Sequence, residues 1–194
     1  TGNALMVMAV ASGKLRLSAL LRVWAVVYVG NFVGAAGTAL LVFLSGQYLG
    51  GEGAVARVAL AIANDKVALP FTQAFFLGLL CNVLVCIAVW LSLGARSASD
   101  KVLVVILPVS AFVAAGFEHS VANLYFLPLG IWLRDSVDVA GIHGVENLNL
   151  SAYVHNLVPV TLGNIVGGSG FVALVYFVIY RLVPRMAEAR RDRS

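Results

Sequence analysis

Charged residues are scarce in this sequence. Asp, Glu, Lys and Arg make up 11% of its 194 residues, whereas soluble domains carry roughly 25%. Hydrophobic residues make up 61%, and the mean hydropathy is +0.95. This composition excludes an ordinary soluble domain and indicates an all-α integral membrane protein in contact with lipid. Nucleic-acid binding is not expected, because the net charge of +4 comes from residues in loops and at the C-terminus.

Residues able to bind a metal or act as a nucleophile are also rare. The two cysteines, Cys81 and Cys86, lie five positions apart in one apolar segment, where helical geometry points them to different faces. We therefore expect no internal disulfide. Glu118 and His119 are adjacent and diverge on a helix, and no other ligand cluster accompanies them, so we expect neither a metal nor a cofactor. The lack of a nucleophile motif argues against an intramembrane enzyme.

Long apolar runs dominate the rest of the sequence. The run 102–133 has 32 residues, whereas about 20 residues cross a bilayer, so we expect a broken helix there. Residues 1–11 are only half a span, and the sequence shows neither an initiator Met nor a signal peptide. We therefore expect a fragment that lacks one upstream span and the first half of another broken helix. The expected segments of this single membrane domain are 1–11, 23–44, 71–93, 102–133 and 153–180, with a tail over 181–194.

A polar stretch interrupts the run 102–133 near its middle. It reads Gly116-Phe117-Glu118-His119-Ser120-Val121-Ala122-Asn123. A charged group at this depth of a membrane costs at least about 2.5–3.5 kcal/mol. Such a cost is tolerated where the group faces a cavity, a partner or a transported species. We therefore expect this break to line a transport path, and a purely structural membrane protein would not need it.

His119 is the residue of this break best suited to proton exchange, because its ordinary pKa lies near about 6.5. In a dry pore, desolvation disfavours its charged form and an arriving anion favours it, which couples protonation to the anion. The alternative is a neutral histidine hydrogen-bonded between helices. Glu118 points away from His119 on a helical turn, so we expect it to stabilise the broken backbone or to pair across a subunit interface.

Three further residues could contact a transported species. Lys66, at the start of the second full span, could draw anions to its outer mouth or lie there as a boundary residue. Asn82, at mid-depth, could donate into a pore or hydrogen-bond between helices. Phe112 lies two turns before His119 and could form a hydrophobic gate, although a lone aromatic residue in a membrane helix is normally part of the core.

The basic residues give the expected orientation. Ten of the 13 Lys and Arg residues fall on one side of the predicted spans, and the positive-inside rule assigns that side to the cytoplasm. The C-terminus is then cytoplasmic. The cytoplasmic set is Lys14, Arg16, Arg22, Arg96, Lys101, Arg181, Arg185, Arg190, Arg191 and Arg193, and the other set is Arg57, Lys66 and Arg134.

An internal repeat accompanies these spans. The pattern Gly-Asn-x-Val-Gly occurs in the first full span and in the last, which run in opposite directions in the expected topology. Small residues allow close helix approach, and asparagine can hydrogen-bond to a neighbouring backbone. Inverted repeats with paired broken helices are typical of transporters and channels. The helix-packing positions are Gly30, Asn31, Gly34, Gly163, Asn164 and Gly167, and the broken-helix scaffold is Glu118, Ser120, Asn123, Gly2 and Asn3.

The segment 116–123 resembles the signature of the formate/nitrite transporter family. Two other segments, 80–86 (Leu-Cys-Asn-Val-Leu-Val-Cys) and 159–168 (Pro-Val-Thr-Leu-Gly-Asn-Ile-Val-Gly-Gly), resemble it as well. Thr1-Gly2-Asn3 is similar to the end of the family's Phe-Thr-Gly-Asn loop. The resemblance implies an aquaporin-like fold with six membrane helices per protomer, in an inverted arrangement of three and three, and a homopentamer with one pore in each protomer.

The resemblance also implies roles for individual residues. It assigns the family's central histidine to His119, its loop threonine to Thr1, its vestibule lysine to Lys66, its pore asparagine to Asn82 and a constriction phenylalanine to Phe112. The first hypothesis for function is a formate channel or transporter of the inner membrane, with protons involved through His119. The alternatives are nitrite or hydrosulfide on the same scaffold and, more remotely, a channel for a neutral solute.

Overall fold

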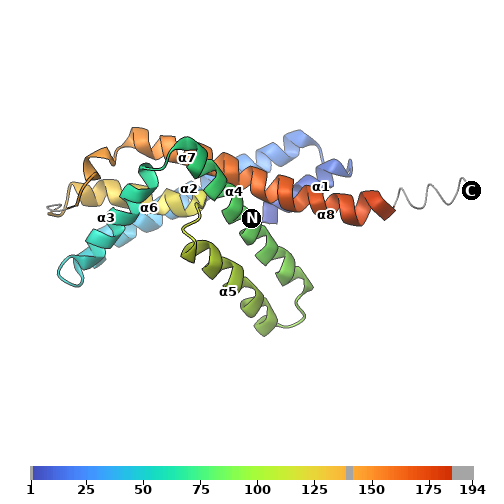
Figure 1. The fold of residues 1–194 in the computed structure, drawn as a ribbon, viewed down its shortest axis with the longest axis horizontal. Coiled ribbons are helices and arrows are strands. Elements are labelled where there is room, and N and C mark those ends of the chain that lie inside the picture. The colour runs from blue at the N-terminus through green and yellow to red at the C-terminus, as the bar shows by residue number, and fades with distance from the viewer. Residues whose placement is uncertain (1, 139–141, 185–194) are drawn as a thin grey trace, which may run out of the picture. The chain divides into compact units, whose positions relative to one another are not determined.

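The computed structural model describes residues 2–138 and 142–184, and every regular element in this part of the chain is helical (Figure 1). The contacts divide the chain into two compact units. Unit 1 is Thr1–Ala25, Leu79–Phe117 and Gly163–Ser194, and unit 2 is Val26–Gly78 and Glu118–Leu162. The α-helices are α1 (Met6–Ala11), α2 (Leu17–Leu44), α3 (Ala54–Val67), α4 (Phe71–Gly94), α5 (Ala98–Ala114), α6 (Ser120–Arg134), α7 (Leu150–Ile165) and α8 (Val175–Phe177). Short 3-10 turns lie at Gly2–Leu5, Gln47–Leu49 and Val145–Asn147, and π-helical segments lie at Val166–Leu174 and Val178–Leu182.

Three helices among the described residues are long and apolar enough to cross a membrane. They are Leu17–Leu44, Phe71–Gly94 and Leu150–Arg181. The first begins earlier than the expected residue 23, because the chain turns at Gly13 after α1 and nothing breaks the helix after Leu17. Arg22 therefore lies on α2 and not in a connecting loop. The expected run 102–133 is divided between α5 and α6, each too short to cross a membrane alone.

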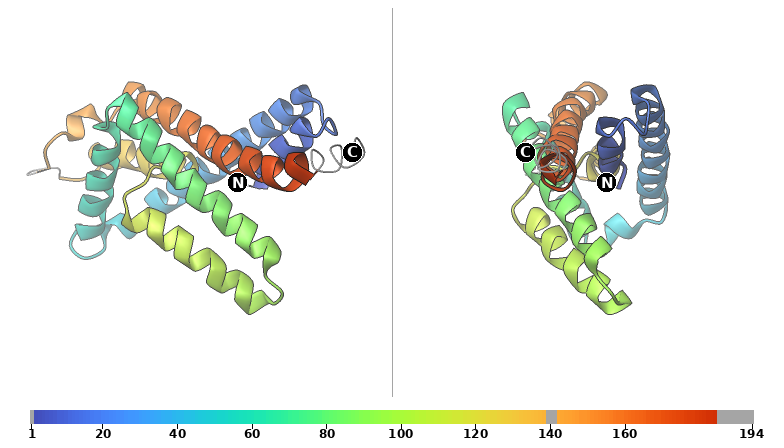
Figure 2. Two further views of the ribbon diagram at one scale, coloured as in Figure 1. Left: turned by 45° about the vertical axis from the view of Figure 1, so that its right-hand side comes forward. Right: turned by 90° about the vertical axis from the view of Figure 1, so that its right-hand side faces the viewer.

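Unit 1 contains α1, the start of α2, the second half of α4, α5 and the last long helix from Gly163 onward. α1 packs against Val166–Leu174, and the indole Nε1 of Trp24 donates to the carbonyl oxygen of Asn3 at 3.2 Å. This bond ties the 3-10 turn before α1 to α2. At the other end, α5 doubles back from α4 through the short connection 95–97 (Figure 2). Ser97 and Asp100 form a capping box there and fix the first residue of α5.

The two copies of the Gly-Asn-x-Val-Gly pattern differ in their surroundings. In unit 1, Gly167 is buried directly against the backbone carbonyl of Leu79, so that any side chain at this position would collide with α4. In unit 2, Gly30 and Gly34 are exposed, and no described atom lies within 4 Å of where a Cβ would stand. The packing role of Gly30 and Gly34 therefore remains a prediction.

Unit 2 is built on the packing of α3 against α6. Helix α3 lies between the expected segments 23–44 and 71–93, in a stretch for which no helix was expected. Its apolar face is easily overlooked because it consists largely of small residues, Ala56, Leu60 and Ala63, at helical spacing. Gly130 of α6 lies against Ala63 with no room for a side chain. The core around this contact contains Leu60, Leu124, Leu127, Leu133 and Leu148, all fully buried.

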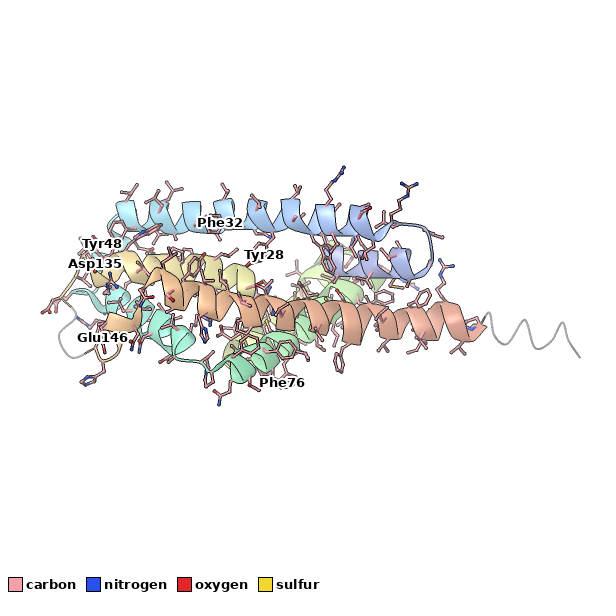
Figure 3. All side chains as sticks on the ribbon, turned by 90° about the horizontal axis from the view of Figure 1, so that it is seen from above. Tyr28, Phe32, Tyr48, Phe76, Asp135 and Glu146 are labelled. Carbon is pink, nitrogen blue, oxygen red and sulfur yellow. The ribbon has the colours of Figure 1, made fainter. Side chains whose placement is uncertain are left out.

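One contact joins equivalent positions of the internal repeat. Tyr28 and Thr161 each lie two residues before the Gly-Asn pair of their own copy. The Tyr28 side chain lies on the side of α2 that faces α7 (Figure 3), and its hydroxyl hydrogen-bonds to Thr161 Oγ1 at 3.1 Å. The two copies of the repeat therefore meet at equivalent positions.

The tight contact of Gly130 gives a test of this packing. We expect Gly130→Ala to lower the free energy of unfolding in detergent by about 1–3 kcal/mol, because the added methyl group overpacks the α3–α6 contact. The matched variant Gly37→Ala also lies in a helix but has no described atom near its Cβ position. It should raise stability by up to about 1 kcal/mol through helix propensity. Equal effects of the two substitutions, measured by denaturant titration, would contradict this description of unit 2.

Candidate functional site

The break between α5 and α6 is narrower than the expected 116–123. The last residue of α5 is Ala114, Gly116 takes the positive φ of +66° that turns the chain, and Ser120 is already helical. Glycine adopts this backbone conformation without steric cost. Ser120 and Asn123, expected in the break, form the first turn of α6 instead. His119 is the residue at which the chain re-enters a helix.

A closed hydrogen-bond network holds this helix start in unit 2. Lys66 Nζ forms an ion pair with Glu118 Oε1 at 2.7 Å, and Asn123 Nδ2 donates to Glu118 Oε2 at 2.6 Å. Asn123 Nδ2 also donates to Asn156 Oδ1 at 2.7 Å. Asn156 Nδ2 then donates to the backbone carbonyl of Lys66 at 2.8 Å, which closes the ring. The network joins α3, α6 and α7.

The ion pair at the centre of this network is shielded from solvent. The exposed fractions of the Lys66 and Glu118 side chains are 14% and 5%. Removing one member of such a pair typically costs about 3–5 kcal/mol, because the other charge stays buried without a partner. Lys66 lies in the last turn of α3 and not at the start of α4, where it had been expected. Its ammonium group also lies 5.8 Å from the centre of the Phe126 ring, within range of a cation–π interaction.

His119 caps α6 with its side chain. Its Nδ1 accepts from the backbone N–H of Ala122 at 3.4 Å, and its carbonyl oxygen accepts from the N–H of Asn123 at 3.0 Å. A nitrogen that accepts a hydrogen bond carries no proton, so the neutral imidazole in this position has its proton on Nε2. A proton added to Nδ1 would remove the acceptor of the cap. Protonation of His119 and the start of α6 are therefore linked.

The other predicted site residues lie outside this network. Asn82 and Phe112 belong to unit 1. Asn82 Nδ2 donates to the carbonyl oxygen of Asn164, at the junction where α7 gives way to the π-helical segment. It thus supplies a donor where the regular helical pattern changes. Phe112 is half-buried on α5. Thr1 lies outside the described residues.

Sequence reasoning missed two members of the site, Asn156 and Phe126. Asn156 is a fully buried carboxamide in an otherwise apolar helix, and a polar residue in such a helix is itself a signal of a functional or bridging role. Phe126 carried no such signal, because its role depends on Lys66 lying above its ring. Within the described part of the chain, no group of three or more His, Cys, Asp or Glu residues could hold a metal ion.

A second ion pair lies at the exposed end of α6. Arg134 binds both carboxylate oxygens of Asp135, at 2.7 and 2.8 Å, and its Nη1 donates to the carbonyl oxygen of Leu148. The hydrogen bonds that Arg134 donates lower the pKa of the Asp135 carboxyl below its ordinary value, and the same bonds raise the pKa of Arg134. Because Asp135 is solvent-exposed, water screens this pair, unlike the pair of Lys66 and Glu118.

Comparison with known proteins links these features to a family. The family model for the formate/nitrite transporter matches residues 1–178. The formate channel FocA of Escherichia coli (strain K12) is 43% identical over 188 residues, which cover 93% of this chain and 66% of FocA. FocA of Haemophilus influenzae is 39% identical over 177 residues, which cover 87% of this chain and 62% of that protein. The chain thus spans slightly less than two thirds of the length of these relatives.

Solved structures show the same similarity. A pentameric formate channel with formate bound matches with a TM-score of 0.80 and 42% identity, over 87% of this chain and 69% of that one. An FNT family ion channel matches with a TM-score of 0.77 and 30% identity, over 91% of this chain and 67% of that one. At these identities the likeness shows the aquaporin-like fold of such channels, and the predicted fold class is confirmed.

The buried ion pair can be tested by a double-mutant cycle. We expect Lys66→Met and Glu118→Gln each to lower the free energy of unfolding by about 3–5 kcal/mol, since each leaves one buried group without its partner. The double variant should cost less than the sum of the two, because no lone charge remains. Asp135→Asn, at the exposed pair, serves as the control and should change stability little. Additive costs in detergent unfolding would show that Lys66 and Glu118 do not interact.

Proposed function

The chain belongs to the formate/nitrite transporter family, and on that premise we propose that it conducts a small monovalent anion, most favourably formate, across a membrane. The observation that carries the proposal is the closed network of Lys66, Glu118, Asn123 and Asn156, which fixes the start of α6 at His119. Relatives that are named as formate channels support the choice of formate.

Lys66 acts in this proposal as the group that draws the anion in. Its charge is balanced by Glu118, so the pair is neutral overall but presents its positive end through the remaining N–H donors of the ammonium group. Conduction requires binding that is strong enough for entry and weak enough for release. An unbalanced lysine in the same place would hold an anion more tightly. Glu118 thus sets the strength of attraction as well as the position of α6.

His119 acts as the proton donor. With Nδ1 engaged in the cap, the neutral imidazole presents Nε2–H as a hydrogen-bond donor to the anion. Proton transfer itself requires the imidazolium form: once a proton from solvent has bound Nδ1, the ring can pass its Nε2 proton to formate, which leaves a neutral imidazole and the neutral acid. The neutral acid crosses an apolar constriction at far lower cost than an ion. Positions in the family motifs, and not geometry, are the basis for including Thr1, Asn82 and Phe112 in the same path.

The same scaffold could carry nitrite or hydrosulfide. The description of the family names both formate and nitrite, and one structural relative is described only as an ion channel. These anions share the charge that Lys66 would attract. Transport of a neutral solute, in contrast, would not require a charged group that attracts anions.

The proposed assembly rests on a structural relative, and the proposed orientation rests on the basic residues of the sequence. We propose a homopentamer, because a structural relative is described as a pentameric channel. We propose an inner-membrane location with the C-terminus in the cytoplasm, because ten of the 13 basic residues fall on one side of the expected spans, the side that the positive-inside rule assigns to the cytoplasm.

Replacing the central histidine tests the proton step. We expect His119→Phe, in full-length protein in proteoliposomes, to flatten the difference in formate flux between about pH 5.5 and about pH 7.5, on either side of the ordinary histidine pKa. The reason is that no proton donor remains at the start of α6. His155→Phe is the control, since His155 is exposed on α7. An unchanged pH profile in His119→Phe would remove His119 from the mechanism.

Competition between substrates tests the choice of anion. Flux of formate, nitrite and hydrosulfide should be measured one against another in the same proteoliposomes at the same two pH values. We expect formate to be fastest and Lys66→Met to slow all three, because the attracting charge is lost. Rapid passage of water or glycerol at the same rate in the unmodified protein, in Lys66→Met and in His119→Phe would favour the neutral-solute channel.

A further inference from the structure

Unit 1 carries an open groove at the corner where α4 ends and α5 begins, a place that the proposed transport path does not use. The groove has a volume of about 730 Å³. Trp90 and Leu93 of α4 and Val104 of α5 contribute its apolar wall, and Arg96 and Asp100 contribute its polar groups. It therefore combines a large apolar surface with a cation at one end.

The apolar wall is left uncovered by the described part of the chain. The side chain of Leu93 is 68% exposed, and α5 has no buried residue. Leu103 and Leu107 on α5 are exposed to a similar degree. Apolar surface of this extent is stable only against lipid or another apolar partner.

A stack of aromatic side chains indicates the level of the membrane at which the groove lies. The Trp90 ring lies 3.9 Å from that of Tyr176, which in turn stacks on Tyr180 at 5.5 Å. Trp and Tyr gather where the hydrocarbon region of a membrane meets the headgroups. The groove therefore lies at the level where a lipid places its phosphate next to its acyl chains.

The charges at the groove favour an anion. Asp100 is occupied by the capping box, where Oδ2 accepts from the N–H of Ser97 at 3.2 Å. No described side chain pairs with the Arg96 guanidinium, and Lys101 stands exposed one residue after Asp100. A guanidinium binds the oxygens of a phosphate group through two parallel hydrogen bonds.

We propose that this groove binds one anionic phospholipid, with its phosphate on Arg96 and an acyl chain along Leu93 and Val104. A free inorganic anion would leave the apolar wall uncovered. An apolar peptide helix would leave the guanidinium without a partner. A phospholipid satisfies both, and the connection 94–101 lies on the side expected to face the anionic cytoplasmic leaflet. The site is independent of which solute the protein transports.

Thermal unfolding of the full-length protein in detergent, with added lipid, tests the proposal. Phosphatidylglycerol should raise the unfolding temperature of the unmodified protein. In Arg96→Gln, the concentration needed for half of that rise should increase about tenfold, the effect of losing one charge-assisted hydrogen bond. Arg57→Gln, which removes an exposed arginine of unit 2, should respond to the lipid as the unmodified protein does.

A second pair of variants keeps the arginine and fills the groove. Leu93→Trp should also weaken the response to phosphatidylglycerol, whereas Leu103→Trp, at an exposed position outside the groove, should not. An unchanged response in both Arg96→Gln and Leu93→Trp would overturn the proposal. Equal stabilisation by phosphatidylcholine or by inorganic phosphate would overturn it as well, since the first lacks net charge and the second lacks acyl chains.

Discussion

The ion pair of Lys66 and Glu118 is the interaction on which the candidate site depends. A carboxylate and an ammonium group are each costly away from water, and each is retained here only because the other is present. Two carboxamides complete the arrangement, since Asn123 satisfies the second oxygen of Glu118 and Asn156 ties Asn123 to the backbone of α3. The three helices α3, α6 and α7 are thereby joined by side chains at the point where the backbone between α5 and α6 is not helical.

Much of the site could be predicted from the sequence because charge in an apolar run is conspicuous. Glu118 and His119 stand out in the run 102–133, and the motifs around them correctly indicated the family and the aquaporin-like fold. The exact limits of the break could not be predicted. Ser120 and Asn123 are polar and looked non-helical, yet the cap supplied by His119 starts the helix at Ser120.

The residues that escaped prediction share one physical cause, which is that their role comes from contacts between distant segments. Helix α3 buries mainly alanines, so its apolar face has little contrast with a polar connection. Asn156 and Phe126 acquire their roles only when Lys66 is brought to them by the packing of α3 on α6. Asn82 stands out in the sequence as a polar residue in a span, but its partner, the carbonyl oxygen of Asn164, belongs to the backbone and cannot be read from the sequence.

The contact between Tyr28 and Thr161 has a consequence for how the two repeats can diverge. Two separate identical chains related by a two-fold axis would have to place the same side chain on both sides of that axis. Two tyrosines would crowd there, and two threonines would not reach each other. Repeats joined in one chain can instead place a long side chain opposite a short one, as they do at a separation of 3.1 Å. Covalent linkage therefore frees equivalent positions that touch each other from the requirement to be identical.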